Sequence, residues 1–404
     1  MKYLTLLLAT FMGCNAYAIS YSPCELEKYF RQTDSYKSSM LDHSAKELEM
    51  EREQLALLPD ISVSSGQQST NNRSFKGLSD SLVSLSLSQS IYNGNRYNKF
   101  KDKIAKDKEY IDLMIHDKRN RYLVDLYRAV IDYNYKTDLH ELYSLQLKQQ
   151  TEQLNASKER LAAGEIAKIE YDIIFLRKEE LQKEVKTIKN EVLQAELDIK
   201  ARFNVPVDKI KEITSKKILL CKSHGQGTGQ ILDQSRMLLK QNENANYQLK
   251  MASTQPSVSL SLNLQPPSGG TLNELTTKKT EFAAAVNVTV PLSSIFSVNN
   301  TRKDHAISIN RIDDTYDEKI KLYLREKENI FNKMIDLERS ISLATKKIEL
   351  KGQEVDYVLS RFREKKDTIM AYYRQLDEFE HEKIKLKQAE REYDYYKTYI
   401  AILN

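Results

Sequence analysis

The chain has 404 residues, of which 40% are hydrophobic and 29% are charged. This length fits two or three globular domains or one long extended architecture. The formal net charge is +5, the difference between 62 basic and 57 acidic residues, and the charges are spread along the chain without a basic block. Such a distribution favours solvated helix faces with local ion pairs, and it gives no support to nucleic acid as a partner.

Residues 1–18 have the pattern of a secretory signal peptide. A lysine precedes an apolar run at residues 3–12, and a small-x-small cleavage pattern follows at residues 16–18 (AYA). The apolar run is shorter than the roughly 20 residues of a membrane-spanning helix, which argues against an N-terminal anchor. Residues 11–14 (FMGC) resemble a bacterial lipobox. We therefore expect cleavage after Ala18, with lipidation at Cys14 as the alternative.

The remaining chain shows two copies of one plan, roughly 200 residues apart. Each copy has a helical stretch, two short strands around a polar loop, and a long helical hairpin. We expect repeat 1 at residues 19–205, an inter-repeat linker at residues 206–230 and repeat 2 at residues 231–404. One heptad seam recurs in the last helix of both copies. Its residues are Leu181, Val185, Ile188, Val192, Ala195 and Ile199 in the first copy, and Leu386, Ala389, Tyr393, Tyr396 and Ile400 in the second.

Four short segments alternate apolar and polar residues as β-strands do. We expect these strands at about residues 60–68, 81–92, 256–264 and 281–292. No further globular sequence is left to cover their apolar face, so lipid is its natural cover. Four strands are too few to close a barrel, and hydrocarbon does not tolerate an open sheet edge. Several chains must therefore pool their strands, which makes oligomerisation a requirement of the fold.

Two very long stretches, between Pro59 and Pro206 and after Pro291, contain no proline and are free to be helical. The first long helix is expected at about residues 96–157, where its length would be roughly 90 Å at about 1.5 Å per residue. Its counterpart is expected at about residues 299–362. Apolar residues at helical and heptad spacing predict lateral packing along each helix. The predicted fold is mainly α with a small β part and long coiled-coil hairpins.

The order and spacing of these elements resemble the outer-membrane efflux protein family typified by TolC, over essentially the whole mature chain. Residues 58–60 (LPD) resemble the leucine-proline step into the first strand of each half in that family. Residues 89–94 (QSIYNG) and 290–292 (VPL) resemble the step out of the second strand. Residues 160–170 (RLAAGEIAKIE) resemble the hairpin tip, in which Ala-Gly is followed by an apolar stretch and a carboxylate.

The resemblance implies a homotrimer in the bacterial outer membrane, with a twelve-strand barrel in lipid and an α-helical tunnel across the periplasm. It implies a periplasmic adaptor (membrane fusion) protein and an inner-membrane ATPase or proton-driven pump as partners. It also implies a passive conduit for efflux or type I secretion, and no enzyme activity. Among cargo classes we favour polypeptide export, because the compact chain resembles dedicated secretion channels such as the dispersin-type exporters of enteric bacteria.

The second hairpin tip, residues 361–371 (RFREKKDTIMA), departs from the family pattern. Lys365 stands where the first copy has Gly164, and Ala371 and Arg374 stand where relatives often carry aspartates that narrow the tunnel. The adaptor-contact candidates at the two tips are Ala163, Gly164, Glu165, Glu364 and Lys365. The pore or gate candidates are Glu170, Asp367 and Arg374. Ordinary solvated helix residues would show the same pattern.

Catalytic chemistry has little support in this sequence. The six histidines are scattered, and none lies in a metal-ligand spacing. Cys221-x-x-His224 supplies two ligands where a structural zinc site needs four. The glycines at residues 225–229 lack the ending of a phosphate-binding loop. We therefore expect no catalytic residue, no cofactor and no metal site.

Cys24 and Cys221 are candidates for a disulfide. Each precedes the first helix of its copy, so a pseudo-symmetric fold would bring both to the same level. An oxidising compartment would permit the bond.

The alternative from another class is a periplasmic or secreted coiled-coil structural or adaptor protein. In that case the serine-rich segments would be ordinary soluble hairpins, since their alternation alone does not identify lipid as the cover. A membrane-fusion adaptor would also need glycine-rich, lipoyl-like segments, which the sequence lacks.

Overall fold

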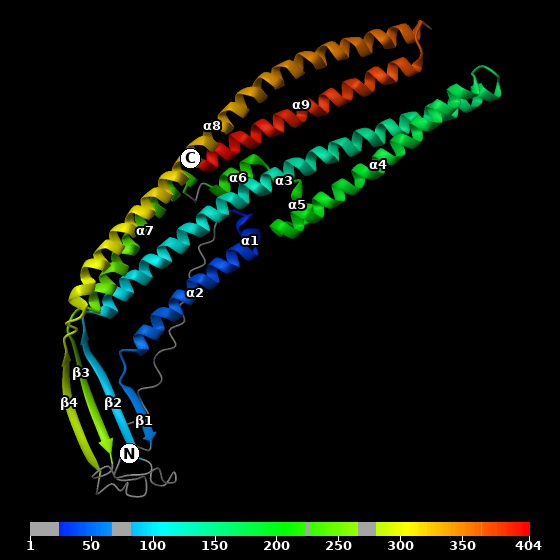
Figure 1. Ribbon diagram of the computed structural model, residues 1–404. Helices are drawn as coiled ribbons and strands as arrows, with labels where there is room; N and C mark the ends of the chain where they lie inside the picture. The colour runs from blue at the N-terminus through cyan, green and yellow to red at the C-terminus, as the bar shows by residue number, and fades with distance from the viewer. Residues whose placement is uncertain (1–23, 67–81, 223–225, 266–279, 365) are drawn as a thin grey trace.

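The computed structural model describes residues 24–66, 82–222, 226–265, 280–364 and 366–404. The predicted signal peptide, Cys14 and Lys365 lie outside these residues. The molecule is a long curved rod, with a β-sheet at one end and the tips of two helical hairpins at the other (Figure 1). The fold is mainly α with a small antiparallel sheet, as the sequence predicts.

The elements follow one another in chain order. They are α1 (Glu27–Phe30), α2 (Asp34–Leu55), β1 (Asp60–Gly66), β2 (Leu82–Asn93), α3 (Arg96–Ala162), α4 (Lys168–Phe203), α5 (Val207–Ile210), α6 (Ser215–Lys222), α7 (Thr228–Ala252), β3 (Ser257–Gln265), β4 (Glu281–Thr289), α8 (Ser294–Arg363) and α9 (Ile369–Leu403). We call α3 and α4 the first hairpin, and α8 and α9 the second hairpin. α3 also packs against α2, α7 and α9.

The strands form one antiparallel sheet in the order β1-β2-β3-β4. The central pair joins the two halves of the chain, because α3 to α7 lie between β2 and β3 in the sequence. Leu87 pairs with Leu262, and Ser88 pairs with Ser261. Directly opposed residues of an antiparallel ladder lie on the same face of the sheet. The register therefore sorts leucines to one face and serines to the other.

The strand bounds differ from the expected ones by up to three residues, and two of the differences have a clear physical reason. β4 ends at Thr289, short of the expected residue 292, because Pro291 has no N–H to donate to a ladder. β2 continues to Asn93 and turns directly into α3 through Gly94 and Asn95, with φ values of 69° and 59°. A Cβ on Gly94 would lie 2.5 Å from the Ala252 carbonyl oxygen, so this turn has room only for glycine.

The segment between the hairpins is not the plain linker that the sequence predicts. α5 and α6 lie within the expected linker, and α7 begins inside it at Thr228. Ile210 and Ile218 are buried, so the burial of apolar side chains orders this segment against the long helices. The prediction missed these helices because they are too short to show a periodic pattern.

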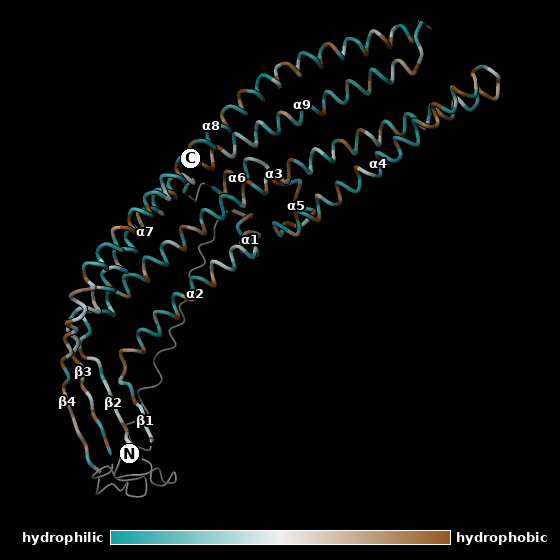
Figure 2. Tube along the Cα trace, in the orientation of Figure 1, coloured by the Kyte–Doolittle hydropathy of each residue, from teal (hydrophilic) through white to brown (hydrophobic). Residues whose placement is uncertain are grey.

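The helices contain both polar and apolar residues (Figure 2). Among the described residues, no helix combines the length and the apolar character of a membrane span. Hydrophilic and hydrophobic positions are interleaved along all the long helices (Figure 2).

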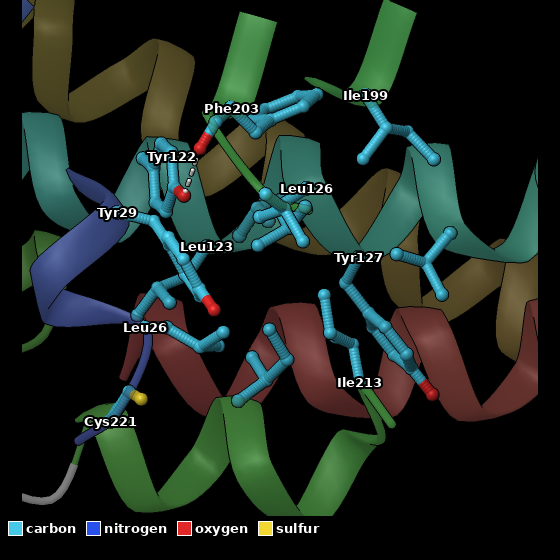
Figure 3. Packing of buried hydrophobic residues seen from close by; sticks show 14 of the residues in the cluster. Leu26, Tyr29, Tyr122, Leu123, Leu126, Tyr127, Ile199, Phe203, Ile213 and Cys221 are labelled. Atoms are coloured by element: carbon cyan, nitrogen blue, oxygen red, sulfur yellow. Dashed lines mark hydrogen bonds between the residues drawn. The ribbon is translucent and has the colours of Figure 1, made fainter. Parts of the chain in front are cut away.

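A buried apolar cluster lies near the middle of the rod, and we call it the waist cluster. It includes Leu26, Tyr29, Phe30, Tyr122, Leu126, Tyr127, Ile199, Phe203, Ile213, Ile218 and Ile402. Figure 3 shows aromatic rings from α1 and α3 packed against the end of α4. The Tyr122 hydroxyl donates a hydrogen bond of 2.8 Å to the Phe203 carbonyl oxygen, which satisfies a polar atom that burial would otherwise leave without a partner. This cluster fixes the short elements to the long helices.

Candidate functional site

The first hairpin turns at Ala163, Gly164 and Glu165, three of the predicted adaptor-contact residues. Gly164 has a φ of 72°, and open space surrounds the position where a Cβ would lie. The Gly164 N–H donates to the Leu161 carbonyl at 3.0 Å, and the Glu165 N–H donates to the Arg160 carbonyl at 2.9 Å. The turn thus satisfies the last carbonyl groups of α3. All three turn residues are exposed and accessible to a partner.

Arg361 ties the second tip together. Its guanidinium contacts the Asp367 carboxylate at 2.6 Å and donates to the Tyr357 hydroxyl at 3.2 Å. Thr368 then caps α9, where its hydroxyl accepts an N–H from the first turn at 3.2 Å. Glu364, the other contact candidate described at this tip, is exposed. Both tips therefore carry an ion pair between an arginine and a carboxylate, since Arg160 pairs with Glu165 at 3.3 Å at the first tip.

The pore candidates lie on different hairpins. Glu170 is exposed in the first turn of α4, whereas Asp367 lies at the second tip in its ion pair with Arg361. Arg374 lies in α9, where it lines a cleft between the hairpins. The two tips lie apart in Figure 1. A single chain therefore does not bring Glu170 next to Asp367.

The inter-hairpin cleft has a volume of about 580 Å³ and lies between the first hairpin and α9. Its lining residues are Gln146, Gln150, Gln153, Ile173, Ile174, Leu176, Arg177, Glu180, Met370, Tyr373, Arg374, Asp377, Glu378 and His381. The three glutamines are buried. Their exposed fractions are 4% for Gln146, 7% for Gln150 and 8% for Gln153. Gln150 donates to the Ile174 carbonyl at 3.1 Å. The side-chain oxygens of Gln146 and Gln153 have no hydrogen-bond partner within the described chain.

Charged groups surround these glutamines. Arg177 pairs with Glu180 at 3.3 Å, and Glu378 pairs with Lys351 at 2.8 Å. Burial raises the pKa of the Asp377 carboxyl, although hydrogen bonding to Gln146 and the charge of Arg177 oppose this shift. Burial is also the main cause that lowers the pKa of the His381 imidazole. The cleft is therefore a polar region where a coiled-coil seam would normally be apolar.

Sequence reasoning missed the cleft although its signal was present. Gln146, Gln150 and Gln153 follow one another at spacings of four and three residues, which are the seam positions of a heptad pattern. A search for apolar periodicity passes over such positions because the residues there are polar.

The structure joins Cys24 and Cys221 in a disulfide, with the two Cα atoms 4.8 Å apart. Both cysteines are buried at the waist cluster, and Figure 3 shows Cys221 beside it. Cys221 is therefore not a free metal ligand, and His224 lies outside the described residues. The described part of the chain contains no group of residues that could hold a metal ion.

The apolar face of the sheet is exposed in the single chain. Ile61 and Val63 of β1 are 65% and 71% exposed, and Phe282, Val286 and Val288 of β4 are 76%, 65% and 64% exposed. The described residues place no helix over this face, which lies beyond the ends of the helices (Figure 1). A contiguous apolar surface of this kind marks contact with lipid or protein.

The long helices also carry exposed apolar residues. Leu343, Leu350 and Tyr357 of α8 follow one another at heptad spacing and are each at least 60% exposed. Near the first tip, Ile169 and Ile173 of α4 are exposed in the same way. A stripe at heptad spacing is the form in which one helix packs laterally against another.

No protein-family model and no curated protein matches the chain. Solved structures match over nearly its whole length. A membrane protein from Pseudomonas aeruginosa is 15% identical, with 93% of this chain and 91% of that chain covered and a TM-score of 0.69. The outer membrane protein VceC from Vibrio cholerae is 10% identical, with 94% of both chains covered and a TM-score of 0.66.

The CmeC outer membrane channel of Campylobacter jejuni is 12% identical, with 94% of this chain and 84% of that chain covered and a TM-score of 0.67. Identity this low establishes a shared fold and leaves activity to be argued from the molecule itself. The resemblance predicted from the order of the elements is confirmed at the level of the fold. The chain thus has the fold of outer-membrane channel proteins.

Proposed function

We propose that the chain is the outer-membrane channel subunit of a tripartite export system and acts as a passive conduit from the periplasm to the exterior. The observation that carries this proposal is the four-stranded sheet, whose apolar face is exposed in a chain with the fold of outer-membrane channels. Outer-membrane lipid would cover this face. The helical part would then lie in the periplasm.

The working unit of this proposal is a homotrimer. β1 and β4 are the edges of the sheet, and hydrocarbon requires a partner for every backbone polar group. β1 and β4 run in opposite directions, because three successive antiparallel pairings separate them. β4 of one copy can therefore pair antiparallel with β1 of the next, and three copies would close a barrel of twelve strands. The exposed stripe on α8 would contact a neighbouring copy.

Each hairpin directly follows a pair of strands, one in each half of the chain. This parallel order supports the proposal of two tandem repeats at residues 19–205 and 231–404. We also propose that the chain reaches its compartment through a signal peptide at residues 1–18.

The proposed partners are a periplasmic adaptor and an inner-membrane ATPase or proton-driven pump, which would supply the energy. The two tips would form the adaptor contact and the periplasmic gate, since they lie at the end of the molecule opposite the sheet (Figure 1). Glu170, Asp367 and Arg374 are the proposed pore residues. The comparisons do not support polypeptide export over other cargo, so the proposal is confined to the conduit.

A matched pair of lysine substitutions on β3 tests this proposal. Leu260 lies on the apolar face and Ser259 on the opposite face. Leu260→Lys should cost about 2 to 4 kcal/mol of membrane insertion if the residue faces lipid near the bilayer centre. Ser259→Lys should leave insertion unchanged. The measurement is the fraction of protein that stays with outer membranes after carbonate washing, together with the mass of the detergent-extracted assembly.

Equal retention of both variants would contradict the assignment of the apolar face to lipid. A parent protein that leaves the membrane on washing, and that is soluble without detergent, would instead favour the coiled-coil alternative. In that case the serine-rich strands would belong to an ordinary soluble sheet.

A further inference from the structure

We propose that phospholipid of the leaflet facing the periplasm covers the junction between the sheet and the helices, so that the membrane boundary lies on the first turn of α8 and not at the ends of the strands. This inference rests on the proposed function, since it takes the apolar face of the sheet as the lipid-facing surface. It adds a second lipid contact, made by turn and helix residues and by basic side chains beyond them.

Exposed apolar residues lie at three of the junctions between strands and helices, and we call them the junction collar. They are Leu58 before β1, Ile91 and Tyr92 near the end of β2, and Leu292 and Phe296 between β4 and the first turn of α8. Each is at least 46% exposed. Tyr92 pairs with Val258 on the apolar face of the sheet. Because β2 is a central strand, the collar is not confined to the sheet edges where a second copy would pair, and lipid can cover all of it.

The apolar face of β4 continues into α8. Val290 and Leu292 extend the alternation of Val288 by two and four residues, and they are 54% and 69% exposed. Phe296 follows Leu292 by one helical turn and is 84% exposed. Figure 2 shows hydrophobic positions along β4 up to its junction with α8. The surface that lipid would cover on the strand is therefore continuous with the first turn of the helix.

The turn between β4 and α8 is short and held by hydrogen bonds. The Leu292 N–H donates to the Val290 carbonyl at 3.0 Å, and the Ser294 N–H donates to the Pro291 carbonyl at 3.1 Å. The Ser294 hydroxyl donates to the same Pro291 carbonyl at 2.6 Å. The helix thus begins directly at the end of the strand, and this turn keeps Phe296 close to the membrane end of the molecule.

The length of the apolar face also requires an extension. Along β4 this face runs from Phe282 to Val288, which is about 20 Å at roughly 3.4 Å per residue. A strand tilt of about 35 to 45° reduces this to about 15 Å across the membrane, whereas the apolar band of an outer-membrane barrel is about 25 Å tall. The apolar surface must therefore continue past at least one end of the described strand. At the helix end, Leu292 and Phe296 supply this continuation.

Basic residues follow the collar on α8. Lys303 lies seven residues after Phe296 and so on the same helix face, about 10 Å further from the sheet. Lys303 and its neighbour Arg302 are exposed, and neither has an ion-pair partner within the described part of the chain. Asp304 follows directly but lies about 100° further around the helix.

The direction of α8 brings these basic groups toward the membrane. Helical side chains lean toward the helix N-terminus, and α8 begins at the sheet. The Lys303 side chain therefore leans back toward the headgroup layer, which is about 5 to 7 Å thick on each side of the bilayer. Long basic side chains reach the interface in this way. The phosphate groups of phospholipid would bind the Lys303 ammonium and the Arg302 guanidinium.

Single tryptophans test the inference, because the chain contains no tryptophan of its own. The full-length variants are Val286→Trp on the apolar face of β4, Phe296→Trp in the collar, Lys303→Trp beyond it and Leu322→Trp far along α8. Each is reconstituted in phospholipid vesicles that carry a nitroxide quencher either on the headgroup or in the middle of the acyl chain. The mass of the detergent-extracted assembly confirms that each variant assembles like the parent, and Leu292→Trp replaces Phe296→Trp if that variant does not.

We expect the preferred quencher to change along this series. Val286→Trp should be quenched more by the acyl-chain nitroxide, and Phe296→Trp should be quenched by both lipids to an extent equal within about twofold, as a residue at the boundary between acyl chains and headgroups would be. Lys303→Trp should be quenched by the headgroup nitroxide at least about twofold more than by the other. Leu322→Trp should be quenched by neither.

The outcomes separate the inference from the proposed function. If Val286→Trp is quenched and Phe296→Trp is quenched by neither lipid, the first turn of α8 lies outside the membrane, and the inference fails while the conduit stands. An unquenched Phe296→Trp with blue-shifted emission would assign the collar to a second copy and would also overturn it. An unquenched Lys303→Trp would overturn the phosphate contact. If Val286→Trp itself is unquenched, the apolar face does not contact lipid and the proposed function fails.

Discussion

Gly164 closes the first hairpin in a left-handed backbone conformation. Residues with a Cβ adopt this conformation only at a cost in free energy. The φ angle of Gly164 is 72°, and a Cβ would meet no atom within 4 Å. Steric space therefore does not restrict which residue fits here. Backbone strain does, because a residue with a Cβ disfavours positive φ. Gly352 offers a matched contrast, since it lies within α8 and a Cβ there would meet the Phe379 ring at an ordinary distance of 3.5 Å.

We predict that Gly164→Ala destabilises the protein by about 1 kcal/mol, because alanine is strained at positive φ. Gly352→Ala should stabilise it by about 0.5 to 1 kcal/mol, because alanine is the better helix former. The check is the thermal unfolding midpoint of both variants in detergent. Shifts of the same sign would mean that the left-handed turn does not limit the stability of the tip.

At the scale of elements, the packing between α3 and the second hairpin changes its chemistry along the rod. Near the waist, Leu123, Leu126 and Val130 of α3 are buried. Toward the tips, the buried residues of α3 include Gln146 and Gln150. Heptad spacing was enough to predict lateral packing of the long helices, because apolar periodicity records which face is covered.

Other features could not be predicted from the sequence. The inter-hairpin cleft could not be predicted because its seam positions are polar. α5 and α6 could not be predicted because short helices show no hydrophobic periodicity. The contacts of the pore candidates were also not predictable. Asp367 was a candidate although Ala371 and Arg374 stand at the family's aspartate positions, and spacing could not reveal its ion pair with Arg361, which depends on how the tip turns.

The cleft makes the stability of the hairpin packing depend on pH. Burial raises the pKa of Asp377, so the folded protein holds this proton more tightly than the unfolded chain does. Stability from this group is therefore greatest below its unfolded pKa and falls as the pH rises through its folded pKa. The hydrogen bond to Gln146 and the charge of Arg177 lower the pKa of Asp377 and so oppose the effect of burial.

We predict that Asp377→Asn raises the unfolding midpoint at about pH 7 and has little effect at about pH 3, where the native carboxyl is protonated. Glu382→Gln is the matched control with the opposite sign. Hydrogen bonding to Lys347 is the main cause that lowers the pKa of Glu382, so its stabilisation is present at neutral pH and is lost in acid. If both substitutions change the unfolding midpoint at about pH 7 in the same direction, burial does not determine how Asp377 affects stability.

At the scale of the whole molecule, the disulfide unites three distant parts of the chain at the waist cluster. Cys24 precedes α1, and Cys221 belongs to α6. The next residue, Lys222, donates a hydrogen bond to the Ala401 carbonyl near the end of α9. The N-terminal segment, the segment between the hairpins and the last helix are thus held together where the long helices pass from the sheet end to the tips.

The two cysteines are 197 residues apart in the sequence, and the chain-entropy model gives about 4 to 5 kcal/mol for closing a loop of this order. We predict that the double variant Cys24→Ala, Cys221→Ala loses about 2 to 5 kcal/mol of unfolding free energy. Reductant should lower the unfolding midpoint of the parent protein toward that of the variant and leave the variant unchanged. If reductant shifts both proteins equally, the waist is stabilised by packing of the apolar cluster alone, and the bond contributes nothing to holding the two halves together.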